Sequence, residues 1–308
     1  MQPAYITHAE CAAHEMGVGH PERPERISAI HDRLLADGLL AQMMAIDAPL
    51  ASREQLSEAH TLGYIDEIIA ASPASGYVQL DPDTAMNSST LQAALRAAGA
   101  AVLATDLVMQ NKAPSAFCNV RPPGHHALCN QAMGFCFFNN VAVGIRHAFV
   151  KYDLQRIALI DFDVHHGNGS EEIFKNDSRV LMCSIFEQGL YPFSGDSPLG
   201  NNMINIGLPK RSGGDRLRAA VINHWLPALD AFKPELIYIS AGFDAHQEDD
   251  MANLGFVDAD FEWATQQIMK VAKDHCQGRV ISCLEGGYAL GALARSAARH
   301  VRVLVEGK

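Results

Sequence analysis

The sequence predicts an α/β fold, in which helices cover both faces of one parallel sheet. Short, continuously apolar runs rich in β-branched residues alternate with longer helix-like segments, and continuous apolarity is typical of parallel strands buried on both faces. No Ser-, Gly- or Pro-rich linker and no internal repeat divides the 308 residues. We therefore expect one domain spanning residues 1–308.

Ten segments carry this prediction. The predicted strands are Ala116–Val120, Arg156–Phe162, Val180–Phe186, Met203–Leu208, Leu236–Ser240 and Val280–Leu284. The predicted helices are Ser88–Met109, Asn140–Val150, Asp215–Phe232 and Asp260–His275. Inside the third helix Pro227 lacks a backbone N–H, so we expect a kink there.

Charge and cysteine usage exclude several classes of protein. The net charge of −11 argues against a general binder of nucleic acid or of anionic membranes, since these proteins need a basic face. No signal-like segment and no run of about 20 uninterrupted apolar residues is found. Seven cysteines without a CxxC pair favour neither a disulfide framework nor a zinc ribbon. These features predict a cytoplasmic protein, and they leave its oligomeric state open.

The first polar cluster follows the predicted strand Arg156–Phe162. Asp161, Asp163 and His165 alternate along the chain, so in an extended segment they share one face. Ligands of open parallel sheets bind beyond the carboxyl ends of strands. One aspartate at such an end is usually a cap or turn residue, but three convergent groups are costly to bury without a cation or hydrogen-bond partners.

A further aspartate, Asp244, follows the predicted strand Leu236–Ser240. Alone it could cap the next helix. Together with Asp163 and His165 it gives a mixed oxygen and nitrogen site, which is closer to a catalytic zinc site with an open position than to a closed structural one.

Two more strand ends carry polar groups. His125 and His126 end the run Arg121–His126, where they are incidental loop residues, general acid–base groups or ligands of a second metal. Tyr288 follows two glycines, which let the backbone pass close to a ligand. A phenol placed there can donate a hydrogen bond to an oxyanion, although such a tyrosine is usually a packing residue.

These four motifs, together with the run Gly19–Arg26, resemble the zinc-dependent histone deacetylase family. The sequence is most similar to the class II branch and to the bacterial histone deacetylase-like amidohydrolases. The resemblance implies a single α/β domain with an eight-stranded parallel sheet. It also implies an enzyme that removes acetyl or other short acyl groups from the amine of acyl-lysine or of a related N-acyl amine, by metal-assisted amide hydrolysis.

The resemblance assigns a role to each motif residue. The implied zinc ligands are Asp163, His165 and Asp244. His125 and His126 form the acid–base pair, with Asp161 accepting a hydrogen bond from His125. Asn168 faces His126 where some relatives carry aspartate, and a neutral amide raises the His126 pKa less than a carboxylate would. Tyr288 polarises the substrate carbonyl.

The resemblance also implies potassium and an acyl-amine tunnel. The first potassium site would use Asp161, Asp163, His165, Ser184 and Ile185. A second would lie near Phe174, Asp177 and Val180. The substrate-binding residues would be Gly134, Phe135, Tyr191, Met251 and Gly286, and rim contacts would come from Asp81 or Asp83. Ordinary core packing is the alternative for the two tunnel aromatics.

Residues at the predicted tunnel mouth bear on which substrate the chain would cleave. Polyamine-specific relatives carry glutamate where this chain has Met251, which favours acyl-lysine or a neutral amide. The nearby acids Glu248, Asp249 and Asp250 keep acetylpolyamines as the alternative. A second alternative is a catalytically weak acyl-lysine binding module, but neither the tyrosine nor a zinc ligand is lost. A binuclear manganese ureohydrolase would need further Asp and His ligands at these strand ends. Asn168 and the lone Asp244 supply too few of them.

Overall fold

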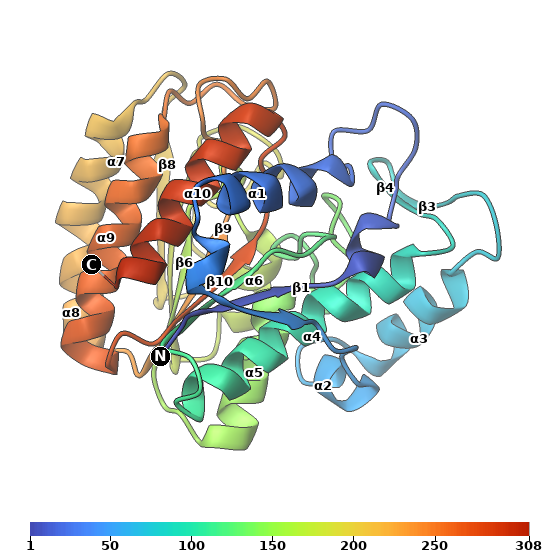
Figure 1. Ribbon diagram of the computed structural model, residues 1–308, viewed down its shortest axis with the longest axis horizontal. Coiled ribbons are helices and arrows are strands. Elements are labelled where there is room, and N and C mark those ends of the chain that lie inside the picture. The colour runs from blue at the N-terminus through green and yellow to red at the C-terminus, as the bar shows by residue number, and fades with distance from the viewer. Residues whose placement is uncertain (308) are drawn as a thin grey trace.

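The computed structural model describes residues 1–307 and contains a parallel sheet of eight strands (Figure 1). In order across the sheet these are β2 (Met44–Asp47), β1 (Ala4–Thr7), β5 (Ser115–Cys118), β10 (Val280–Leu284), β9 (Leu236–Ala241), β6 (Ile157–Asp161), β7 (Val180–Glu187) and β8 (Met203–Leu208). Every pair of neighbours is parallel. The predicted fold class is therefore confirmed.

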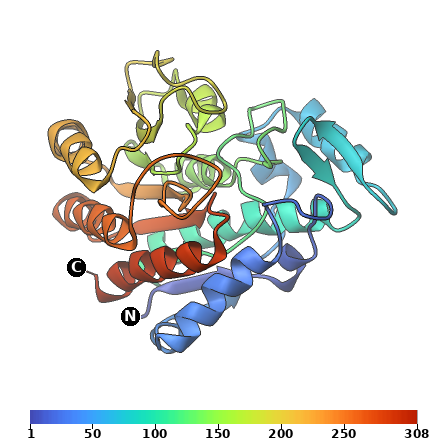
Figure 2. The same ribbon diagram turned by 90° about the horizontal axis from the view of Figure 1, so that it is seen from above.

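Helices cover both faces of this sheet (Figures 1 and 2). One face carries α1 (Glu25–Ala36), α9 (Asp258–Cys276) and α10 (Leu290–Glu306), with α7 (Gly214–Ala220) and α8 (Leu226–Phe232) beside α9. The opposite face carries α4 (Thr90–Met109) and α5 (Asn140–Tyr152). Shorter elements are α2 (Arg53–Ser57), α3 (Leu62–Ala71), α6 (Asn168–Phe174) and the antiparallel hairpin of β3 (Val78–Asp81) and β4 (Thr84–Met86).

The predicted elements are all present, and their ends differ from the prediction by at most two residues. Two strands of the large sheet, β1 and β2, were not predicted from the sequence. Both are only four residues long, and β2 at the sheet edge alternates half-buried and exposed positions, so neither forms a continuous apolar run. The other elements that were not predicted are helices α1, α2, α3, α6 and α10 and the β3–β4 hairpin. Helix α1 begins directly after Pro24.

The interruption expected at Pro227 takes the form of a π-helical turn over Val221–Trp225, between α7 and α8. The N–H of Leu226 reaches back to the carbonyl of Val221. Because Pro227 donates no hydrogen bond, the regular α-helical ladder cannot pass through this point, and the wider turn is a common way of accommodating such a break.

Helix α4 is the one described helix that is long and apolar enough to cross a membrane by length and composition. Most of that apolar stretch is buried inside the fold, where it packs against α5, β1 and β5. Its buried face consists largely of alanine, which lets it lie close to its neighbours.

Four central strands, β5, β10, β9 and β6, lie side by side. Because they are parallel, their carboxyl ends meet at one edge of the sheet. The loops that follow these strands carry the four polar motifs, and the sheet order therefore gathers residues that are far apart in the sequence.

Candidate active site

Three buried ligand-type side chains meet at this edge. Asp163 and His165 lie in the turn after β6, Asp244 lies in the loop after β9, and their ligand atoms are all within 4.8 Å of one another. Nδ1 of His165 lies 3.1 Å from Oδ1 of Asp163 and 3.2 Å from Oδ2 of Asp244. The cluster that the two strand ends predicted is therefore formed.

The backbone reaches this arrangement by a tight turn and not by the extended segment that we expected. The N–H of Asp163 donates to Oδ1 of Asp161 at 3.1 Å, and the N–H of His165 donates to Oδ1 of Asp163 at 2.8 Å. Such local bonds are typical of aspartate in turns. As a result Asp161 is directed to His125 and does not join the ligand cluster.

The cluster has the charge and donor set of a cation site. Two buried carboxylates face one imidazole, and Oδ2 of Asp244 has no hydrogen-bond partner of good geometry. Burial lowers the pKa of His165, but the adjacent carboxylates of Asp163 and Asp244 outweigh it and raise the pKa to about 10. Burial, and then the charge of Asp163, raises the pKa of Asp244 to about 6. A divalent cation would offset this excess negative charge, and two oxygens with one nitrogen suit zinc.

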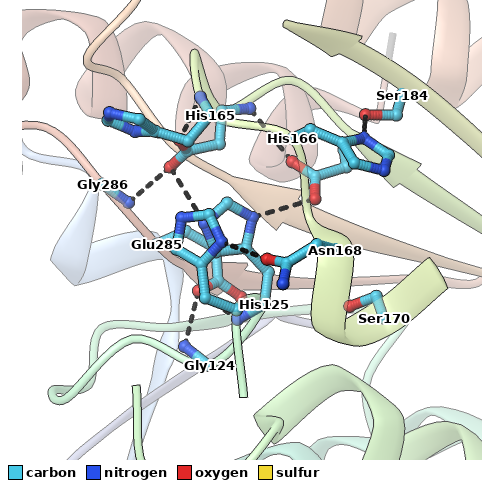
Figure 3. A network of polar contacts seen from close by, with 12 residues as sticks. Gly124, His125, His165, His166, Asn168, Ser170, Ser184, Glu285 and Gly286 are labelled. Carbon is cyan, nitrogen blue, oxygen red and sulfur yellow. Dashed lines mark hydrogen bonds and ion pairs between the residues drawn. The ribbon is translucent and has the colours of Figure 1, made fainter. Parts of the chain in front are cut away.

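Two glycines let the backbone pass directly against these carboxylates. A Cβ atom on Gly286 would collide with Oδ2 of Asp244, and one on Gly242 would collide with Oδ2 of Asp163. The N–H of Gly286 donates to Oδ2 of Asp163 at 2.8 Å (Figure 3). Any larger residue at Gly286 or Gly242 would therefore displace a predicted ligand.

The two histidines of the loop after β5 lie beside the cluster, with their ring centroids 4.0 Å apart. Nδ1 of His125 lies 3.0 Å from Oδ2 of Asp161, and Nδ1 of His126 lies 2.7 Å from Oδ1 of Asn168. These are the pairings that the resemblance implied. Both histidines are almost completely buried.

The surroundings push the two imidazoles toward opposite protonation states. Burial lowers the pKa of His125, but the charges of Asp163 and Asp161 outweigh it and raise the pKa to about 10. Burial, and then the charges of His125 and His165, holds the pKa of His126 well below its usual value. Neighbouring groups whose pKa values diverge in this way suit different acid–base roles.

Hydrogen bonding also fixes which nitrogen of His126 is free. The Asn168 amide donates to Sδ of Met133 at 3.3 Å, so its oxygen faces His126. An amide oxygen only accepts, and Nδ1 of His126 must therefore carry the proton. Nε2 of the neutral ring is left to accept a proton.

Tyr288 lies in the same cleft, in the loop after β10. The N–H groups of Tyr288 and Ala289 donate to Oδ2 of Asp249 at 2.6 and 2.9 Å. The guanidinium of Arg26 lies 4.8 Å from the centroid of the tyrosine ring. Nε of Arg26 donates to the Gly287 carbonyl at 2.6 Å. The loop that carries Tyr288 is therefore held by both Asp249 and Arg26.

Arg26 belongs to a buried ionic network that begins in the run Gly19–Arg26. The carboxylate of Glu22 accepts from Arg26 at 3.0 Å and from Nη2 of Arg121 at 2.6 Å, and it lies 3.3 Å from Nε2 of His14. Glu22, Arg26 and Arg121 have no exposed side-chain surface. The network links the start of the chain to the loops that carry the histidines and Tyr288.

A cavity of about 210 Å³ opens above these groups. Its lining comprises Asp83, Pro123, His125, His126, Gly134, Phe135, His165, Leu190, Tyr191, Met251, Gly286 and Tyr288. All five residues that were predicted to bind substrate are among them. Asp83 lines the cavity, whereas Asp81 does not.

The residues predicted for the first potassium site lie at the carboxyl end of β6 and in the adjoining part of β7. Asp161 is in register with Ser184, which precedes Ile185. Oγ of Ser184 lies 3.1 Å from Nδ1 of His166 (Figure 3). A cation at this position stays a prediction.

The second predicted potassium site is filled by a side chain. Nδ2 of Asn202 donates to the carbonyls of Phe174, Asp177 and Val180 at 3.0, 3.1 and 2.9 Å. These three carbonyls therefore surround an amide nitrogen, which has only two hydrogens for three acceptors. A second cation near them stays a prediction.

Sequence reasoning gave no role to Arg26 or Glu285, and it considered Asp249 only as an acid near the tunnel mouth. Each is a charged residue inside or beside a recognised motif, and each bonds to the backbone of a site loop. Charged residues are seldom fully buried without a partner. Their partners are main-chain atoms of distant segments, which leave no local pattern in the sequence.

Comparison with known proteins decides the family. The sequence model described as "Histone deacetylase domain" matches residues 20–304. The chain belongs to the histone deacetylase family. It is 36% identical to the histone deacetylase-like amidohydrolase of Pseudomonas aeruginosa, over 88% of this chain and 73% of that protein.

Two further relatives support this assignment. A probable deacetylase of Archaeoglobus fulgidus is 34% identical, over 95% of this chain and 83% of the relative. The crystal structure of the HDA15 HD domain superposes with a TM-score of 0.92 at 30% identity, covering 99% of this chain and 88% of that domain. Membership of the family and the names of its relatives support a hydrolase of the deacetylase type.

Proposed function

We propose that the protein is a zinc-dependent deacetylase that removes acetyl or other short acyl groups from acyl-lysine. The observation that carries the proposal is the position of the Asp163, His165 and Asp244 cluster. It lies at the floor of an enclosed cleft, next to two histidines whose pKa values their surroundings shift in opposite directions.

Zinc would be held by one carboxylate oxygen of Asp163, Nδ1 of His165 and Oδ2 of Asp244. When bound, it supplies Lewis acidity for the scissile carbonyl and lowers the pKa of an attacking water. Oδ2 of Asp244 is buried and has no hydrogen-bond partner of good geometry, which is the clearest sign that this donor set suits a metal.

The chain's own residues would handle the protons. Nε2 of His126 is the free base and accepts the proton of the attacking water, after which it returns a proton to the leaving amine. His125 is held by Asp161, whose carboxylate favours the protonated imidazole, and in that form His125 stabilises the negative charge that develops on the carbonyl oxygen. The phenol of Tyr288 donates a hydrogen bond to the same oxygen.

The cleft also positions the substrate. Phe135 and Tyr191 form walls for an aliphatic chain, with Met251 at the mouth. The ring of Tyr191 lies edge-on to that of His126, with centroids 5.3 Å apart. Aromatic walls of this kind exclude water from the reacting amide.

The acids near the mouth are less available to a cationic substrate than the sequence suggested. Glu248 is paired with Arg295 at 2.6 Å, and Asp249 is buried against the Tyr288 backbone. Glu248 and Asp250 are exposed, and of these two only Asp250 has no ion-pair partner within the described residues. This favours acyl-lysine over acetylpolyamines, which remain the second candidate.

The test is release of free amine from an acetyl-lysine peptide by protein whose zinc content has been measured. Acetylated polyamines serve as competing substrates. Hydrolysis that disappears on chelation and returns with zinc supports the proposal. A protein with one zinc per chain that cleaves neither substrate would instead be a binding module.

A further inference from the structure

The loop that carries the two histidines has few backbone donors of its own. Pro122 and Pro123 lack an N–H, so the first donors after them are those of Gly124 and His125. Both donate to the same atom, Oε2 of Glu285, at 2.6 and 3.1 Å (Figure 3). One carboxylate oxygen therefore binds the start of the histidine loop.

The sheet explains how Glu285 reaches this loop. Glu285 directly follows β10, which pairs with β5, and the chain leaving β5 leads into the histidine loop. The backbone of Glu285 is itself fixed. Its N–H donates to the Ala241 carbonyl at 3.0 Å, and its carbonyl accepts from Arg26. A rigid segment thus holds the loop through a single side chain.

The cost of burying this carboxylate indicates a specific role. Glu285 has no exposed surface, and its second oxygen, Oε1, has no hydrogen-bond partner. Burying a charged group is unfavourable unless its hydrogen bonds compensate. The bonds that compensate here are those to Gly124 and His125, and without Glu285 both N–H groups would be buried without an acceptor.

We propose that Glu285 is a positioning residue for His125 and His126, acting through its hydrogen bonds to the loop backbone. The inference rests on the proposed deacetylase function. His125 is held at its N–H by Glu285 and at Nδ1 by Asp161, and His126 is the next residue. Displacing such a pair by about 1 Å can cost about 100-fold in rate.

Hydrogen bonding and charge can be separated at this position. Glu285→Gln keeps an oxygen that accepts from both N–H groups but removes the charge, whereas Glu285→Ala removes both. Burial raises the pKa of Glu285 to about 7, so a neutral side chain is compatible with these surroundings. Positioning through hydrogen bonds predicts that glutamine rescues what alanine loses.

The experiment compares wild type, Glu285→Ala and Glu285→Gln, each zinc-loaded, on an acetyl-lysine peptide. Asp260→Ala is the matched control. Asp260 is also a buried carboxylate that accepts from a backbone N–H, that of Val257 at 3.0 Å, but it lies at the start of α9 and does not line the cleft. We expect Glu285→Ala to lower kcat about 10- to 100-fold with KM and zinc content unchanged.

Glu285→Gln is expected to keep most of the wild-type kcat, and Asp260→Ala to lower Tm without lowering kcat. Amide hydrogen exchange at Gly124 and His125 should accelerate in Glu285→Ala and stay at the wild-type rate in Glu285→Gln. If the alanine variant does not fold, Glu285→Asp replaces it, since it keeps the charge but shortens the reach. The aspartate variant should lose kcat.

Two results would overturn the inference. Glu285→Ala with wild-type kcat would show that the bonds do not position the pair, and equal losses in the alanine and glutamine variants would assign the effect to charge. An inactive wild type would overturn the proposed function instead. In that case the exchange rates at Gly124 and His125 would still decide whether Glu285 holds the loop.

Discussion

Oδ1 of Asn168 accepts a hydrogen bond from Nδ1 of His126 at 2.7 Å. The partner of this imidazole is therefore a neutral amide, whereas the partner of His125 is the carboxylate of Asp161. Together with burial and the two neighbouring histidines, this difference keeps His126 in the base form that the proposed reaction needs.

Replacing Asn168 with aspartate is expected to shift the pH profile. A carboxylate favours the protonated imidazole, which raises the His126 pKa by about 1 to 3 units. The free base is then lost at a higher pH, so activity falls more at pH 6 than at pH 8. Measuring kcat/KM against pH tests this, and an acid limb that does not move would remove His126 as the base.

Removing the phenol hydroxyl should slow catalysis without disturbing the fold. Tyr288→Phe is expected to lower kcat about 100- to 1,000-fold, as for loss of an oxyanion donor, with zinc content and Tm unchanged. The control is Tyr64→Phe, which removes a buried hydroxyl that donates to the Phe137 carbonyl outside the cleft. Equal kcat in both variants would contradict the assigned role of Tyr288.

A carboxylate at the cleft mouth should change substrate preference. Met251 lines the cleft, and Met251→Glu would place a negative charge there. The ratio of kcat/KM for an acetylated polyamine to that for an acetyl-lysine peptide is expected to rise, because a distal ammonium gains a partner. Met251→Gln is the neutral control, and an equal rise in that variant would exclude charge as the cause.

Asn202 should contribute to stability in place of a cation. Asn202→Ala leaves the carbonyls of Phe174, Asp177 and Val180 without their donor. The expected loss is about 1–3 kcal/mol in the free energy of unfolding. Potassium should raise the Tm of this variant more than that of the wild type, and Asn201→Ala, at an exposed neighbour, should resemble the wild type. No change in either quantity would show that the amide does not substitute for an ion.

The sequence predicted the centre of the molecule better than its margins. Central strands such as β9 and β10 are buried on both faces and form continuous apolar runs, so they could be recognised. The edge strand β2 is half exposed and does not form such a run. The cluster of Asp163, His165 and Asp244 could be predicted because parallel strands end at one edge.

Residues that act on distant backbone could not be predicted. Glu285 contacts a loop 160 positions earlier in the chain. Asn202 reaches three carbonyls that only the folded chain brings together. Such contacts form only when the chain folds, so they cannot be recognised from the spacing of neighbouring residues in the sequence.

The most direct test of the account is the dependence of acetyl-lysine hydrolysis on zinc. Wild type and Asp244→Ala are measured side by side, each with its metal content determined. The account predicts that wild type binds one zinc per chain, loses activity on chelation and regains it with zinc. It predicts that Asp244→Ala remains folded but neither retains zinc nor hydrolyses the peptide. Full activity in chelated wild type, or in Asp244→Ala, would contradict the proposal that this cluster is the catalytic metal site.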